Sequence, residues 1–84
     1  MDRQAIQETV LFFVQECGNI RSDNYDVSLF SADFGFQACD MAHVLIGIYN
    51  IYSIPMERLM KELQTYSVNE IVHCVAEAQK AGNP

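Results

Sequence analysis

The chain has 84 residues, half of them hydrophobic, and a formal net charge of −6. A chain of this length forms one domain, residues 1–84, around a single apolar core, and its modest charged fraction excludes intrinsic disorder. The excess of acidic side chains excludes nucleic acids and anionic membranes as partners, because both attract lysine and arginine. A protein with a basic surface is the expected partner instead.

The cysteines and histidines form no recognisable disulfide or metal pattern. Cys17, Cys39 and Cys74 are an odd number with wide spacing, and His43 and His73 lie at no zinc-ligand spacing from them. The N-terminal residues lack the layout of a secretory signal, and no apolar run approaches the roughly 20 residues that span a bilayer. We therefore expect a soluble protein of the reducing cytoplasm, without a bound metal.

Residues 2–17 predict the first helix, because their apolar side chains recur at helical spacing. Asp2 is a suitable N-cap and Gly18 a suitable stop. The residues expected on the buried face are Ala5, Ile6, Val10, Phe13 and Val14.

Residues 18–37 break this periodicity and predict a long loop. The loop nevertheless contains many large apolar side chains, which are Ile20, Val27, Leu29, Phe30, Phe34 and Phe36. Because exposing them all to water is unfavourable, we expect the loop to pack across the helices. Phe13 and the three loop phenylalanines are expected in the core.

Residues 38–52 predict a second helix, with Asp40 in its first turn, where a carboxylate interacts favourably with the helix dipole. Its expected core stripe consists of Met41, Val44, Leu45, Ile48 and Tyr52. Ile46, Tyr49 and Ile51 do not fit this stripe. Either they form an exposed docking strip with Cys39 and Met41, or the following helix and the loop cover them.

Two further helices are predicted at residues 55–63 and 67–79. Pro55 suits the first turn of the shorter one, and Ser67 with Glu70 predicts a capping box for the longer one. The side chains expected to point inward are Met56, Leu59, Met60, Leu63, Val68, Ile71, Val72 and Val75. The fold class is therefore all-α, with three longer helices, one short helix and a long first loop.

This layout resembles the acyl and peptidyl carrier proteins over almost the whole chain. The resemblance lies in the order and spacing of five segments: Asp26-Val27-Ser28-Leu29-Phe30, Phe34-Gly35-Phe36, Asp40-Met41 with the apolar run through Tyr52, Ile54-Pro55, and Tyr66-Ser67-Val68. It implies a four-helix acyl-carrier-protein-like bundle.

The chain departs from this family at the position that defines it. Aligning Gly35 with the family glycine places Gln37, Ala38 and Cys39 on an Asp-Ser-Leu signature whose serine holds the phosphopantetheine arm. Ala38 has no hydroxyl group, so the resemblance implies a carrier-related member that lacks this cofactor, unless Ala38 replaces a natural serine. Cys39 is an alternative thioester carrier or redox group, because a helix N-terminus lowers a thiol pKa, or it belongs to a contact patch in place of the family leucine.

A second departure concerns the surface that partners recognise. Family members that serve fatty-acid synthesis have several glutamates along the second helix, where this chain has His43, Tyr49 and Asn50. The resemblance therefore implies a partner with a more apolar surface.

No catalytic constellation is present, since the chain has no Ser/His/Asp order, no convincing carboxylate pair and no phosphate-binding glycine loop. We therefore expect a monomeric, non-enzymatic docking protein, and the resemblance suggests that its partner is a biosynthetic or modifying enzyme of a bacterial biosynthetic or peptide-maturation system. The candidate partner-binding residues are Cys39, Asp40, Met41, His43, Ile46 and Tyr49. A working carrier and a helical dimerisation module are the alternatives.

Overall fold

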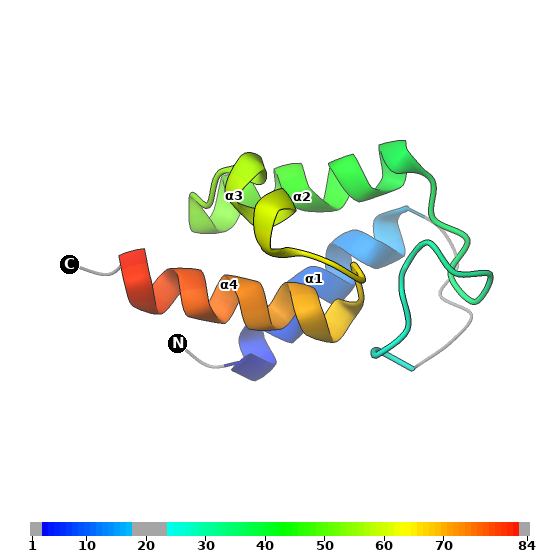
Figure 1. Ribbon diagram of the computed structural model, residues 1–84, viewed down its shortest axis with the longest axis horizontal. Helices are drawn as coiled ribbons and strands as arrows, with labels where there is room; N and C mark the ends of the chain where they lie inside the picture. Colours follow the sequence, from blue (N-terminus) through cyan, green and yellow to red (C-terminus); the bar gives the residue numbers. More distant parts are fainter. Residues whose placement is uncertain (1–2, 18–23, 83–84) are drawn as a thin grey trace.

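Four helices follow one another in a computed structural model, which describes residues 3–17 and 24–82. They are α1 (Arg3–Glu16), α2 (Ala38–Tyr52), α3 (Met56–Glu62) and α4 (Val68–Gly82) (Figure 1). α1 packs against both α2 and α4, and the short α3 contacts α2 and α4. The prediction of an all-α, four-helix domain with a loop between the first two helices is confirmed.

The helix boundaries agree with the predicted ones within one residue, apart from the end of α4. The predicted N-cap Asp2 and the predicted stop Gly18 lie outside the described residues. α4 continues to Gly82, beyond the predicted end at residue 79. The side-chain amide of Gln79 donates to the carbonyl oxygen of Tyr52 at 3.1 Å, and this tertiary hydrogen bond holds the last turns of α4 against the end of α2.

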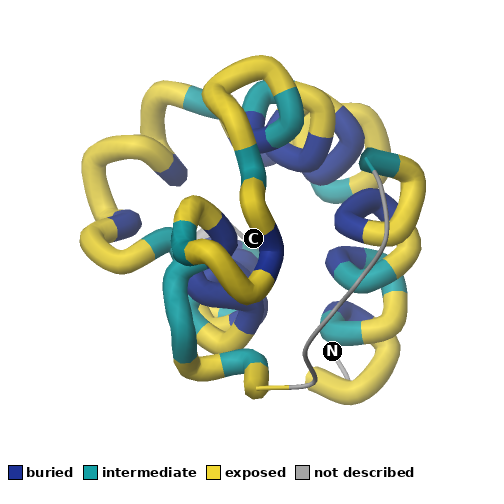
Figure 2. The backbone as a smooth tube through the Cα atoms, turned by 90° about the vertical axis from the view of Figure 1, so that its right-hand side faces the viewer, coloured by how far each residue is buried: buried dark blue, intermediate teal, exposed yellow. Residues whose placement is uncertain are grey.

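The core is formed by the inward faces of all four helices (Figure 2). The stripes predicted for α2 and α4 are buried, except that Tyr52 is only half-buried. Ala5 is exposed, contrary to expectation, because the neighbouring Ile6 and its partners on the same stripe already fill the contact of α1 with the core. Within residues 3–17 and 24–82, none of the helices has the length and apolar content that crossing a bilayer requires.

The described part of the first loop, residues 24–37, packs across the start of α4, as predicted. The amide of Leu29 donates to the carbonyl oxygen of Tyr66, and the amide of Asn69 donates to that of Tyr25, both at 3.0 Å. Leu29 and Phe34 are buried. The predicted loop residue Ile20 lies outside the described residues.

The N-termini of α2 and α4 are capped by side chains, a carboxylate at α2 and a serine hydroxyl at α4. Oδ2 of Asp40 accepts the backbone N–H of Gln37 at 2.9 Å, which closes a capping box at the start of α2. At α4, Oγ of Ser67 accepts the N–H of Glu70 at 3.1 Å, as predicted. The carboxylate of Glu70 does not return to Ser67. It accepts instead the N–H groups of the three preceding residues, 64–66.

Candidate docking site

The solvent-facing side of α2 lacks formal charge. Apart from the capping Asp40, no exposed or half-buried residue of α2 is an Asp, Glu, Lys or Arg. These residues are Ala38, Cys39, Ala42, His43, Ile46, Tyr49, Asn50, Ile51 and Tyr52. Such a helix face is unusual on a chain with a net charge of −6, because the surface helices of globular proteins normally present charged side chains to water. This side of α2 is therefore a candidate binding surface.

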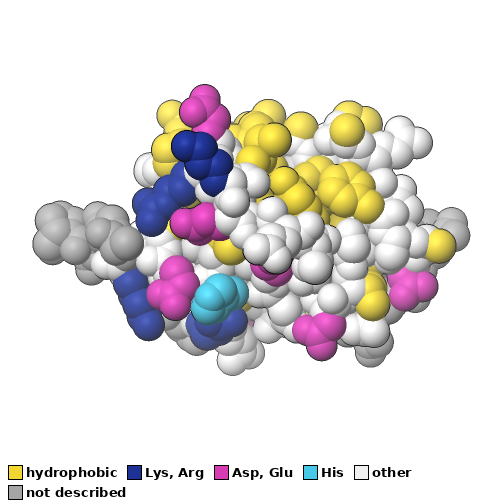
Figure 3. All heavy atoms as spheres, viewed as in Figure 1, with side chains coloured by type: hydrophobic (Ala, Val, Ile, Leu, Met, Phe, Trp, Pro, Cys, Tyr) yellow, Lys and Arg dark blue, Asp and Glu magenta, His cyan; other side chains and the backbone are white. Residues whose placement is uncertain are grey.

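An apolar groove of about 300 Å³ lies beside this face, between α2, α3 and the first loop. Figure 3 shows hydrophobic side chains gathered along the upper part of the molecule, over α2 and α3. The residues that line the groove are Phe30, Ala38, Met41, Ala42, Leu45, Met56, Met60 and Tyr66.

A second groove of about 300 Å³ adjoins the first one, because Met56 lines both. Its other lining residues are Ile46, Tyr49, Pro55 and Glu57. We refer to the lining residues of the two grooves together as the α2–α3 face. Glu57 is the only charged residue among them. The face is thus an apolar surface with a single acidic group.

Ile46 and Tyr49 are the predicted site residues that the structure places at the surface of the grooves. Ile46 is 48% exposed and Tyr49 is similarly accessible. Ile51 is 56% exposed but lines neither groove, so it does not belong to the α2–α3 face. The alternative in which α3 and the loop cover all three of these residues is wrong.

Met41 does not belong to an exposed strip. It is only 4% exposed, because it lies on the core stripe of α2 together with Leu45 and Ile48. It still lines the first groove, at a place where the groove reaches the core. Cys39 is exposed and lines neither groove.

Two residues of the α2–α3 face that were expected in the core are exposed. Met60 and Phe30 are both about half exposed. Each follows a fully buried leucine, Leu59 or Leu29, and adjacent side chains point in different directions. Adjacency alone is no signal for exposure, since the neighbours Val44 and Leu45 are both buried. The Phe30 ring packs edge-on against Tyr66, with a centroid distance of 5.6 Å.

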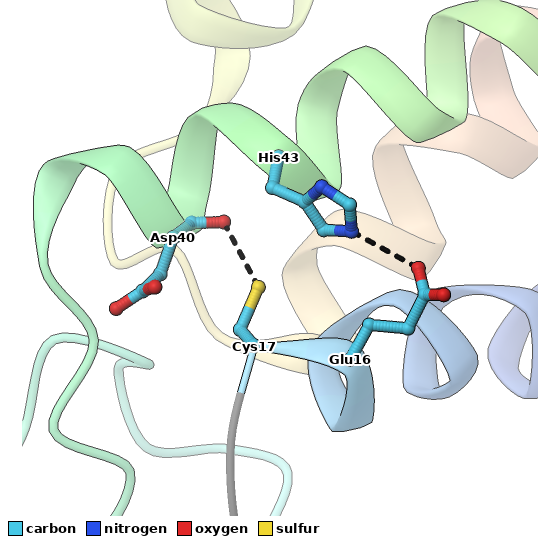
Figure 4. A network of polar contacts seen from close by, with 4 residues as sticks. All are labelled: Glu16, Cys17, Asp40 and His43. Carbon is cyan, nitrogen blue, oxygen red and sulfur yellow. Dashed lines mark hydrogen bonds and ion pairs between the residues drawn. The ribbon is translucent and has the colours of Figure 1, made fainter.

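Asp40 and His43 have contacts within the protein that the sequence did not indicate (Figure 4). Nε2 of His43 lies 3.0 Å from Oε1 of Glu16, and Sγ of Cys17 donates to the backbone carbonyl oxygen of Asp40 at 3.4 Å. These contacts join the end of α1 to the start of α2. Burial raises the pKa of the Cys17 thiol, and the charges of Asp40 and Glu16 raise it further, so the thiol stays protonated.

The residues around position 38 do not fit a phosphopantetheine attachment site. Ala38 lines the first groove with a methyl group, which cannot form a phosphodiester. The nearest upstream hydroxyls are engaged or enclosed: Oγ of Ser28 accepts the N–H of Phe30, and Oγ of Ser31 is buried. In the part of the chain that the structure describes, no three His, Cys, Asp or Glu side chains gather as a metal-ion site requires.

Comparisons with protein-family models, with curated proteins and with solved structures find no match to this chain. The candidate site therefore rests on the geometry of the α2–α3 face.

Proposed function

We propose that this chain is a non-enzymatic docking protein, related to acyl and peptidyl carrier proteins but without phosphopantetheine, which binds an enzyme through the α2–α3 face. The partner is a biosynthetic or modifying enzyme of a bacterial biosynthetic or peptide-maturation system, and the docking protein acts as a monomer in the cytoplasm. The observation that carries this proposal is the pair of adjoining apolar grooves beside an uncharged helix face.

The relationship to carrier proteins is supported by the order of the elements. The chain has two long helices, then one short helix and then one further long helix, which is the order that the resemblance implies. Ala38 begins α2, where the family has its attachment residue. A methyl group at this position favours recognition over group transfer, because it offers no nucleophile or leaving group.

An intact-mass measurement tests whether the chain carries phosphopantetheine. The purified protein is incubated with coenzyme A and a phosphopantetheinyl transferase, alongside an authentic carrier protein as positive control. No mass gain is expected. A gain in this chain, mapped to Cys39 or any other residue, would identify a working carrier and overturn the proposal. The Ala38→Ser variant, run in parallel, shows whether a serine at this position accepts the arm.

Affinity capture from the host extract tests the docking role. The immobilised chain is compared with Ile46→Asp and with the matched control Ile51→Asp, which makes the same change on the same helix outside both grooves. We expect to capture an enzyme with the unchanged chain and with the Ile51 variant, but not with the Ile46 variant. After purification, this enzyme should bind the unchanged chain directly. Equal capture by all three proteins contradicts the proposal. Light scattering over a concentration series tests whether the chain is a monomer. We expect the mass of one chain at every concentration, whereas a rise to the mass of two chains would indicate a dimerisation module.

A further inference from the structure

The α2–α3 face has the length of a short helix. The side of α2 that borders the grooves extends from Ala38 to Tyr49, and at 1.5 Å per residue this corresponds to about 16 Å, or three helical turns. A helix that lies along this distance places three apolar side chains, at i, i+4 and i+7, into the grooves.

The walls of the grooves favour an occupant that satisfies its own backbone. α2 and α3 are helices, so most of their backbone groups are already paired. The loop residues at the rim are also engaged: the N–H of Phe30 donates to Ser28, and Tyr66 donates to Glu70 and accepts from Leu29. An extended peptide pressed against such walls loses water from N–H and C=O groups without gaining partners, whereas a helix brings its own hydrogen bonds.

The side chains of the grooves are suited to packing against another helix. Three of them, Met41, Met56 and Met60, are flexible thioethers that adapt to the shape of an incoming side chain. Ala38 and Ala42 lie one turn apart on α2, and their small size lets a partner backbone approach closely at that end.

The charge of the molecule indicates the kind of helix. The chain carries −6, and the only charged residue among the lining side chains is Glu57. Lys61 and Arg58, the cationic residues of α3, line neither groove. A second copy of this chain would bring another charge of −6 and a second Glu57 to the contact, so its approach is electrostatically unfavourable. A basic partner is attracted instead.

From these observations we infer that the α2–α3 face binds a basic amphipathic α-helix of the partner, with its apolar side chains in the two grooves and lysine or arginine at its flanks. This inference rests on the proposed docking function and specifies the chemistry of its partner.

Three fluorescently labelled peptides of one length test the inference by fluorescence anisotropy. The first is a designed helix with leucines at i, i+4 and i+7 and lysines on both flanks. The second replaces the lysines by glutamates. The third is identical to the first except that a proline replaces its central residue, which breaks the helix. We expect the first peptide to bind at least about tenfold more tightly than either of the others, and less tightly as salt rises from roughly 50 to 300 mM.

The variants of the protein locate the binding. Ile46→Asp is expected to weaken the binding of the first peptide by about tenfold or more, and Ile51→Asp to leave this binding unchanged. Circular dichroism checks that both variants fold. Failure of the first peptide to bind, or equal binding of all three, overturns the inference. The inference is also overturned if the chain forms a homodimer that dissociates in the Ile46→Asp variant. If the peptides fail while an enzyme is still captured through Ile46, the docking function stands and only the helical partner is wrong.

Discussion

The ring of Phe13 on α1 lies directly against the backbone of Gly47 in the middle of α2. A Cβ atom added to Gly47 would be 2.6 Å from Cε1 of Phe13, well inside van der Waals contact. The same ring is edge-on to the imidazole of His43, one turn earlier on α2, at a centroid distance of 6.2 Å. This close approach explains why α2 contains glycine in its interior, where glycine is otherwise unfavourable.

Gly47→Ala is therefore expected to destabilise the domain, although alanine is the better helix former by about 1 kcal/mol. The added methyl group has to displace the Phe13 ring, and overpacking of this kind costs about 1–3 kcal/mol. Urea unfolding followed by circular dichroism measures the change. The loss in the free energy of unfolding of the double variant Phe13→Leu/Gly47→Ala should be less than the sum of the losses of the two single variants, because leucine at position 13 leaves room for the added methyl group. A net gain of stability in Gly47→Ala would show that the ring moves freely.

Ile46 and Ile48 are two positions apart on α2, and the same substitution should change the stability of the domain by very different amounts at the two positions. Ile48 is fully buried, so Ile48→Asp places an uncompensated carboxylate in the core and is expected to unfold the domain, because the cost of several kcal/mol approaches the whole stability of a small protein. Ile46→Asp is expected to change the free energy of unfolding by less than about 1 kcal/mol. Thermal unfolding of both variants measures the difference. Unfolding of the Ile46 variant would show that this side chain belongs to the core.

The apolar periodicity predicted the helices and most of their buried faces, because burial of a stripe is what holds a helix in a small domain. It did not predict the exposure of Met60. α3 has only seven residues and buries Leu59 fully, and its position between α2 and α4 decides which other side chains reach the core. Neither the pairing of Glu16 with His43 nor the grooves were predictable, since both depend on how separate elements pack together.

The three cysteines should differ strongly in reactivity. Cys39 is exposed, whereas Cys17 is half-buried and Cys74 is buried, and burial raises the pKa of both these thiols. Since the thiolate is the reactive form, one equivalent of iodoacetamide at neutral pH should modify Cys39 first. Peptide mapping by mass spectrometry identifies the site, and Cys39→Ala should react at least about tenfold more slowly than the unchanged chain. Preferential labelling of Cys17 would mean that the contact between α1 and α2 opens readily.

Glu70 gives the connection before α4 a pH-dependent component of stability. Partial burial raises the pKa of this carboxyl group, but hydrogen bonds from the backbone N–H groups of Tyr66, Gln64 and Thr65 outweigh this effect and lower it below its usual value of 4.5. The folded state therefore binds the proton less tightly than the unfolded chain. The stabilisation is fully present above the usual pKa and is lost as the pH falls through the lowered, folded-state pKa.

Glu70→Gln should accordingly reduce the free energy of unfolding by about 1 kcal/mol near neutral pH, because a neutral amide oxygen accepts the same N–H groups more weakly than a carboxylate does. The difference between the unchanged chain and this variant should remain constant down to about pH 5 and shrink below it. Urea unfolding at a series of pH values measures it. Glu77→Gln, on the exposed side of the same helix, is the matched control and should show little change. A difference that grows as the pH falls would mean that Glu70 is held in its protonated form.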